Sequence, residues 1–160
     1  MKTLLVVYHS ATGGTRRMAE AAAVSDTEVM VRLLRAPDAT AADLLTADGY
    51  IFAAPENLAA LAGVMKDFFD RTYYPALDRL NGRPYAALIC AGSDGENAAR
   101  QIARIATGWR LKPIAPPLIV LTHAQTPEAI AAPKIISPED LHRCADIGAT
   151  MTAGLAAGIF

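Results

Sequence analysis

The sequence has few of the features that mark disulfide-bonded, metal-binding or membrane proteins. Among 160 residues it has two cysteines, Cys90 and Cys144, which are far apart and form no CxxC pair. This argues against a disulfide framework and a zinc site, and predicts reduced, buried thiols in a cytoplasmic protein. The apolar run at residues 147–160 is shorter than the ~20 residues that span a membrane. The N-terminal apolar run is likewise too short for a signal peptide.

Net charge and aromatic content are low as well. Fifteen Lys and Arg residues against sixteen Asp and Glu residues give a formal net charge of -1, and aromatic residues make up 6% of the chain. The balanced charge argues against nucleic acid as a partner, and against the strongly acidic surface of a dedicated docking carrier. Apolar residues make up 52%, enough to bury a core. We therefore expect a single domain over residues 1–160.

Apolar strand-like runs alternate with helical patterns along the chain. Strands are predicted at residues 3–8, 28–34, 49–54, 84–91 and 117–122, and helices at 14–23, 40–46, 61–80, 97–109 and after Ser137. Pro55 is expected to stop the third strand, and residues 123–136 are expected to form a loop. Five strands alternating with helices predict an α/β fold with a doubly wound parallel sheet. In such folds the ligand lies beyond the carboxyl ends of the strands, so the loops after strands one, three and four are expected to form the site.

The first of these loops, HSATGGT at residues 9–15, has the composition of an anion-binding turn. Backbone N–H groups that lead into a helix N-terminus carry partial positive charge. Ser10, Thr12 and Thr15 add hydroxyl groups, while Gly13 and Gly14 leave room for a phosphate. The turn lacks the lysine of GxxxxGK[ST] and does not match GxGxxG. It suits a phosphate monoester bound without Mg²⁺, and an ordinary strand-to-helix connection remains the alternative.

Three segments of the chain carry a family resemblance. Tyr8, Ser10, Gly13, Thr15 and Ala19 lie at the spacing of the flavodoxin signature. ADGYIFAAPENLAALAGVMKDFFDRT and AGSDGENAARQIARIATGWRLK resemble later segments of small flavodoxin-like proteins, including NAD(P)H-dependent oxidoreductases and quinone reductases. The resemblance implies a flavodoxin-like three-layer sandwich with a five-stranded parallel sheet of order 2-1-3-4-5.

The resemblance also implies FMN as the cofactor. The residues implied to hold its 5′-phosphate are Ser10, Ala11, Thr12, Gly13, Gly14 and Thr15. Those implied to line the isoalloxazine ring are Pro55, Glu56, Asn57 and Leu58 on one side and Gly92, Ser93, Asp94 and Gly95 on the other. No side chain is assigned as catalytic, and no metal is expected.

The resemblance favours an oxidoreductase that transfers two electrons from NADPH or NADH through FMN to a quinone or a similar small-molecule electron acceptor. A flavodoxin-type one-electron carrier acting with protein partners is the alternative, and a scaffold that has lost the cofactor is a third possibility. A homodimer or homotetramer is compatible with the resemblance.

The chain departs from flavodoxins proper because its second and third loops contain no Phe, Tyr or Trp. The ring is then either less tightly held or covered by a residue of a second subunit. Tyr73 and Tyr74 are candidates for such a cover, although packing along their own helix is favoured. Glu56 is expected either to bond to the flavin or to cap the next helix. His9 and His123 either reach the site or simply end their strands.

Overall fold

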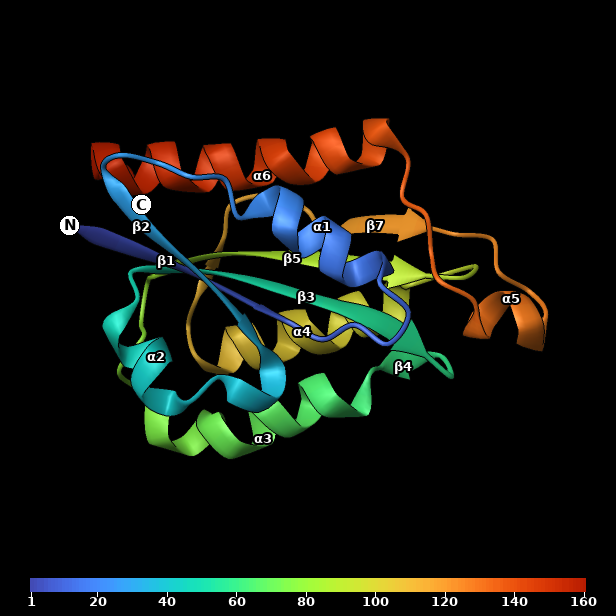
Figure 1. Ribbon diagram of the computed structural model, residues 1–160. Coiled ribbons are helices and arrows are strands. Elements are labelled where there is room, and N and C mark those ends of the chain that lie inside the picture. Colours follow the sequence, from blue (N-terminus) through green and yellow to red (C-terminus); the bar gives the residue numbers. More distant parts are fainter.

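A parallel sheet forms the middle layer of the computed structural model, which describes residues 1–160 (Figure 1). Its parallel strands are β1 (Lys2–Tyr8), β2 (Val29–Arg35), β3 (Gly49–Asn57), β5 (Pro84–Ala91), β6 (Lys112–Pro113) and β7 (Leu118–Leu121). The short β4 (Ala60–Leu61) pairs antiparallel with the end of β3. Neighbours follow the order β2-β1-β3-β5, and both β6 and β7 pair with β5. If β6 and β7 are counted as one interrupted strand, the predicted order 2-1-3-4-5 is confirmed.

The interruption of the fifth strand was not predicted. β6 pairs with Pro84 and Tyr85 at the start of β5, whereas β7 pairs with residues 88–91 near its end. Pro116 and Pro117 lie between the two pieces. Proline has no N–H to donate to a neighbouring strand, so the ladder stops there and resumes at Leu118.

Helices cover both faces of the sheet (Figure 1). α1 (Gly14–Ala22) and α6 (Pro138–Ala157) pack together on one face, and α2 (Ala41–Thr46), α3 (Gly63–Ala76) and α4 (Glu96–Gly108) lie on the other. A single 3₁₀ turn (Ala36–Asp38) precedes α2. Thr40 caps α2 in a reciprocal capping box with Asp43, and Ser137 caps α6. Side-chain caps of this kind explain why both helix starts were predictable from the sequence. No helix is both long and apolar enough to cross a membrane.

The face under α3 and α4 holds the aromatic core. Phe52 and Phe69 pack against Trp109, which is fully buried, and Phe68 packs against both phenylalanines. The indole Nε1–H of Trp109 donates to the carbonyl oxygen of Tyr73 at 3.0 Å, and the two rings stack. Tyr73 therefore packs within its own domain, as favoured from the sequence.

Several predicted boundaries were wrong. β3 continues through Pro55 to Asn57 because the Pro55 carbonyl still accepts a hydrogen bond, from Ala62, where β4 folds back. The helix predicted at 61–80 is shorter, since Leu61 belongs to β4 and the helix ends at Ala76. Residues 123–136 are not wholly a loop, because they contain α5 (Pro127–Ala131), capped by Thr126.

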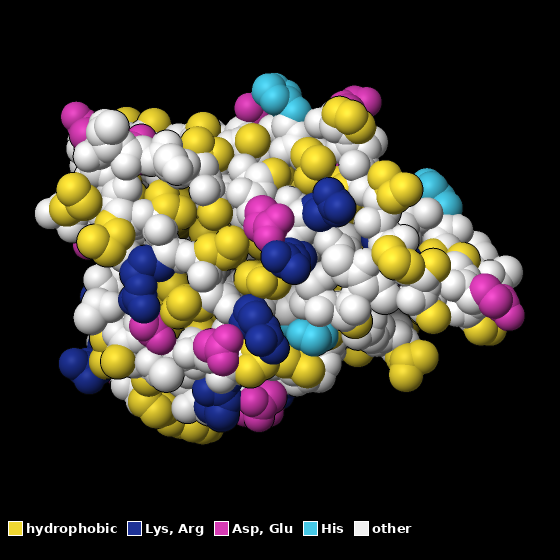
Figure 2. All heavy atoms as spheres, viewed as in Figure 1, with side chains coloured by type: hydrophobic (Ala, Val, Ile, Leu, Met, Phe, Trp, Pro, Cys, Tyr) yellow, Lys and Arg dark blue, Asp and Glu magenta, His cyan; other side chains and the backbone are white.

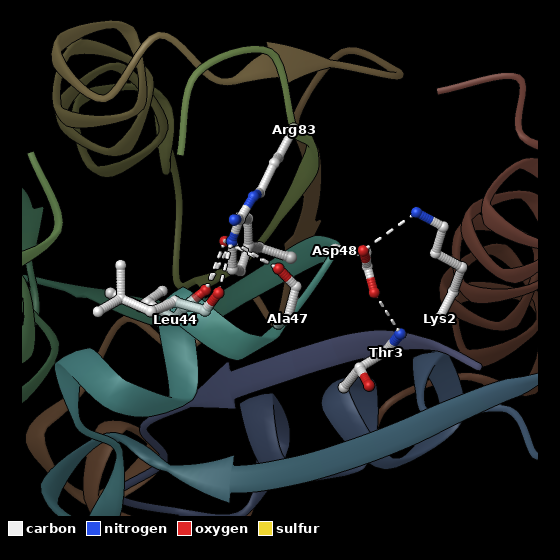
Figure 3. A network of polar contacts seen from close by, with 8 residues as sticks. Lys2, Thr3, Leu44, Ala47, Asp48 and Arg83 are labelled. Carbon is white, nitrogen blue, oxygen red and sulfur yellow. Dashed lines mark hydrogen bonds and ion pairs between the residues drawn. The ribbon is translucent and has the colours of Figure 1, made fainter. Parts of the chain in front are cut away.

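Polar contacts fasten the amino end of the sheet (Figure 3). The Arg83 guanidinium donates to the carbonyl oxygens of Leu44 and Ala47, at 3.1 and 2.7 Å, where α2 ends. A cation at this position stabilises the exposed carbonyl end of a helix. Asp48 accepts from the Thr3 amide at 2.8 Å and pairs with Lys2. The contacts of Asp48 join the start of β1 to the turn before β3. They lie at the amino end of the sheet, opposite the carboxyl ends of the strands, where ligands bind in such folds.

Candidate functional site

A cavity of about 490 Å³ lies beyond the carboxyl ends of the central strands. Ligand pockets usually measure ~300–1,000 Å³. The predicted site residues that line it are Ser10, Ala11, Thr12, Gly14, Thr15, Pro55, Glu56, Asn57, Leu58, Gly92 and Ser93. The structure thus brings the three predicted loops together at the end of the sheet where sequence reasoning placed the site.

The loop before α1 has the geometry of an anion-binding turn. Ser10 Oγ accepts from the Gly13 amide at 3.1 Å, and Gly13 has a positive φ of 91° that favours glycine. No side chain caps α1. The first amides of the helix, at residues 14–16, therefore have no intrahelical acceptor and are available to an anion.

The two glycines of this loop have different roles. An added Cβ on Gly13 would meet nothing within 4 Å, and Gly13 does not line the main cavity. Its positive φ sets the backbone turn, and the space beside it is open, so its expected part in making room for the phosphate stays a prediction. A Cβ on Gly14, in contrast, would lie 2.9 Å from Cys90 Sγ and 3.1 Å from Lys134 Cβ. Gly14 therefore allows the loop to pack closely against β5 and the segment before α6.

A lysine does approach this loop, although none lies within it. The Lys134 amide donates to the Thr12 carbonyl oxygen at 2.9 Å. Its ammonium Nζ lies 3.3 Å from Thr12 Oγ1, and it donates to the carbonyl oxygens of Ile130 and Ala132 at 2.7 and 2.6 Å. Sequence reasoning missed this residue because 122 positions separate it from Thr12 and no local motif marks it.

The segment between β7 and α6 forms a fourth wall of the cavity. Besides Lys134, this segment contributes Thr122, Ala124, Gln125 and Ile130 to the lining. Three further lining residues were not predicted from the sequence and come from other elements: Ala59, Cys90 and Ala91. An added Cβ on Gly92 would lie 2.9 Å from the Ala124 carbonyl oxygen. The loops after β5 and β7 are thus in direct contact, which could not be read from either sequence segment alone.

The second loop is a tight hairpin between β3 and β4. Asn57 pairs with Ala60, and the two residues between them, Leu58 and Ala59, have positive φ values of 50° and 61°. Positive φ at both central positions is usual for Asn-Gly turns and costs roughly 1 kcal/mol or more for each other residue. Asn97 Nδ2 donates to the Ala59 carbonyl oxygen at 2.6 Å and holds the turn against α4. The Leu58 side chain is 100% exposed at the cavity mouth.

Glu56 lines the cavity, but its carboxylate is bonded to backbone amides. One oxygen accepts from Gly95 at 2.9 Å and the other from Ala98 at 3.0 Å. Negative charge at this position stabilises the start of α4. Glu56 therefore caps a helix, as one of the two sequence alternatives held, although the helix is α4 rather than the next one, α3.

The third loop divides into two parts. Gly92 and Ser93 line the cavity, whereas Asp94 and Gly95 do not. Asp94 Oδ1 accepts from the Glu96 amide at 3.3 Å, and Gly95 has a φ of 87°. A Cβ on Gly95 would lie 2.7 Å from Ile119 Cγ2. Asp94 and Gly95 thus shape the start of α4 and do not line the main cavity, and their expected position against the ring stays a prediction.

Other candidates from the sequence lie outside the main cavity or are held within the fold. His9 and His123 do not line it, and the Tyr74 side chain is exposed elsewhere. Cys90 does line the cavity floor. Burial raises the pKa of its thiol, while a hydrogen bond with Thr15 acts in the opposite direction. A thiol with a raised pKa is a poor nucleophile at neutral pH. The cavity has no aromatic lining residue, as expected from the sequence.

The fold and the position of the cavity define a flavodoxin-like α/β protein. A flavodoxin from the domain Archaea has the same fold, with a TM-score of 0.79 and 22% identity, over 96% of this chain and 98% of that one. The sequence model of the NADPH-dependent FMN reductase family matches residues 18–126, and the chain belongs to this family. The predicted family and the predicted flavodoxin-like fold are thereby confirmed.

Curated relatives carry both of the activities considered above. A flavodoxin of Aquifex aeolicus is 34% identical over 100 residues, covering 59% of this chain and 53% of that protein. An NAD(P)H dehydrogenase (quinone) of Acidithiobacillus ferrooxidans is 35% identical over 95 residues, covering 45% of this chain and 48% of that protein. The chain thus spans about half the length of these relatives. The family match covers residues 18–126, so it includes neither the 10–15 loop nor Lys134. The contact between this loop and Lys134 is known from the structure alone.

Proposed function

We propose that this protein binds FMN in the main cavity and transfers two electrons from NADPH or NADH to a quinone or a similar small acceptor. The observation that carries the proposal is the uncapped start of α1, which opens into a cavity of fitting size at the carboxyl end of the sheet. A cytoplasmic location, a single domain and a homodimer or homotetramer remain parts of the proposal.

The lining residues fit the two ends of FMN. The amides at residues 14–16 and the hydroxyl groups of Ser10 and Thr12 form a donor set for the phosphate, and Lys134 adds positive charge. The strained hairpin at Leu58, together with Gly92 and Ser93, provides walls of small or apolar residues for the ring.

In this proposal the side chains bind and position, and none acts as an acid or a nucleophile. FMN, when bound, supplies the acceptance and release of a hydride equivalent. The hairpin at Leu58 borders the cavity mouth, and the contacts of Glu56 and Asn97 keep it in position against α4. Rigid support of this kind limits the reorganisation needed on binding.

Replacing Lys134 by Met is expected to weaken FMN binding about tenfold, because the positive charge beside the phosphate loop is lost. Riboflavin has no phosphate, so its affinity should change little. The measurement is quenching of flavin fluorescence during titration of the apoprotein. Lys112→Met is the matched control, since Lys112 is exposed at the opposite end of the sheet. Equal losses for FMN and riboflavin would show that Lys134 only fastens α5.

The proposed activity is tested with the FMN-loaded protein alone, without air. NADPH or NADH should bleach the visible absorbance of the flavin, and a quinone should restore it. Free FMN at the same concentration and with the same nucleotide is the control for uncatalysed reduction. If the purified protein binds no FMN, or if neither nucleotide reduces it, the proposed function is wrong.

The one-electron carrier is the second candidate, favoured by the similarity to the Aquifex flavodoxin and by the exposed apolar side chain of Leu58. A carrier would stay oxidised with either nucleotide and become reduced only when a separate reductase protein is added. The same bleaching experiment therefore distinguishes the two functions.

A further inference from the structure

A second cavity adjoins the main one and has no role in the proposal so far. It measures about 480 Å³ and lies beyond the ends of β1 and β2. Ser10 and Ala11 line both cavities, so this stretch of the first loop is their common wall. The two cavities are therefore neighbours on either side of the first loop.

The charged side chains that line the second cavity are all basic. Arg16 comes from α1, Arg35 ends β2, and His9 follows β1. In Figure 2, Lys and Arg side chains and a histidine lie on the face over α1 and the end of β2, with Asp and Glu side chains among them. The lining of the second cavity, which includes basic side chains and no acidic one, contrasts with the formal net charge of -1 for the whole chain. The cavity therefore presents a local positive field.

The two guanidinium groups are available to a ligand. Arg35 is exposed and has no ion pair or side-chain hydrogen bond. Arg16 bonds to Glu20 only through Nε, at 2.8 Å, in a pair exposed at both ends. Such exposed pairs contribute little and are readily exchanged for a stronger partner. The terminal nitrogens of Arg16 and the whole of Arg35 thus remain free.

The surroundings of His9 and the apolar wall of the cavity add to this picture. Burial, followed by the charge of Arg35, lowers the pKa of His9 below its ordinary value. The lowering of the His9 pKa by Arg35 indicates a positive electrostatic potential at this position, which a bound anion would offset. Tyr8 and Val64 line the same cavity, and Val64 is 38% exposed. These side chains offer apolar surface beside the charged groups, as a nucleoside phosphate requires.

We infer that the second cavity binds the 2′-phosphate of NADPH, with Arg16 and Arg35 as the phosphate-binding side chains. This rests on the proposed function, and it makes NADPH rather than NADH the preferred donor. A phosphate monoester carries about −1.5 to −2 charges near pH 7, which two guanidinium groups match. Each of the two phosphates in the diphosphate bridge of NADH carries a single charge. Arginine binds phosphate through paired N–H donors, and accommodates this same 2′-phosphate in dinucleotide-binding α/β folds.

The test is calorimetric titration of the FMN-loaded protein with 2′-phospho-ADP-ribose and with ADP-ribose, which contain no nicotinamide and differ only in the 2′-phosphate. Loading with FMN first keeps them out of the 10–15 loop. We expect 2′-phospho-ADP-ribose to bind at least tenfold more tightly than ADP-ribose. Arg35→Gln and Arg16→Gln should each weaken binding of 2′-phospho-ADP-ribose about tenfold. They should also raise the KM for NADPH and leave the KM for NADH nearly unchanged.

Arg17→Gln is the matched control, because Arg17 is exposed on the same helix, carries the same charge and lines neither cavity. Equal affinity for the two nucleotides, or an equal effect of all three variants, overturns the inference while FMN binding and reduction still support the proposed function. A loss of affinity for FAD but not for 2′-phospho-ADP-ribose in Arg35→Gln would also overturn it, by assigning the cavity to the flavin adenylate. If the wild-type protein binds no FMN, the proposed function itself fails.

Discussion

Replacement of Gly14 by Asp is expected to reduce FMN affinity by at least about 100-fold. Gly14 lines the main cavity, and its missing side chain lets the phosphate loop lie against Cys90 and Lys134. A carboxylate at this position adds negative charge to the loop proposed to hold the phosphate. Like charges 4 Å apart repel by ~4 kcal/mol near a protein surface, which corresponds to about a thousandfold in affinity. Pairing of the new carboxylate with Lys134 would also remove the positive charge that favours the phosphate. Flavin fluorescence quenching measures the loss.

Two comparisons separate the electrostatic effect from a general disturbance of the loop. Gly14→Ala adds the crowding Cβ without charge and should give a smaller loss. Gly63→Asp places the same carboxylate in open space at the first residue of α3, and should bind FMN normally. Riboflavin, which lacks phosphate, should lose less affinity than FMN in the Gly14→Asp protein. Unchanged FMN affinity in Gly14→Asp would show that the 10–15 loop does not hold the phosphate.

Replacement of Gly148 by Ala is expected to lower the free energy of unfolding by about 3 kcal/mol or more. In a helix interior this change normally stabilises by roughly 0.5–1 kcal/mol. Here an added Cβ would overlap the Ala22 carbonyl oxygen and lie 2.7 Å from its carbonyl carbon. Backbone atoms cannot rotate away as a side chain can, so α6 would have to move off α1. Overpacking of cores costs about 1–3 kcal/mol, occasionally more.

Urea denaturation followed by circular dichroism measures this effect. Gly63→Ala is the control: its added Cβ meets nothing within 4 Å, and it should be neutral or slightly stabilising. The two glycine-to-alanine changes should thus differ in sign as well as in size. Similar unfolding free energies for both variants would mean that α6 does not approach α1 as closely as the structure shows.

Features encoded over a few residues were predicted well. The alternation of apolar runs and helical patterns specified the parallel sheet, and Thr40 and Ser137 marked two helix starts by hydroxyl caps. The small and hydroxyl residues after β1 predicted a turn into a helix start. The boundaries that failed, at Pro55 and around Leu61, lie where the chain folds back in the β4 hairpin. That pairing depends on positive φ at Leu58 and Ala59, residues that do not signal such a turn.

By itself the sequence determined the α/β fold, the order of its elements and the three loops that meet at the site, because apolar periodicity and helix caps act within one turn or strand. Only the tertiary structure decided that Lys134 reaches Thr12, that Glu56 caps α4, and that Arg16 and Arg35 face one cavity. These contacts join residues from separate strand ends. Parallel strands bring their carboxyl ends to one edge, but which side chains meet there depends on the twist of the sheet and the packing of the helices.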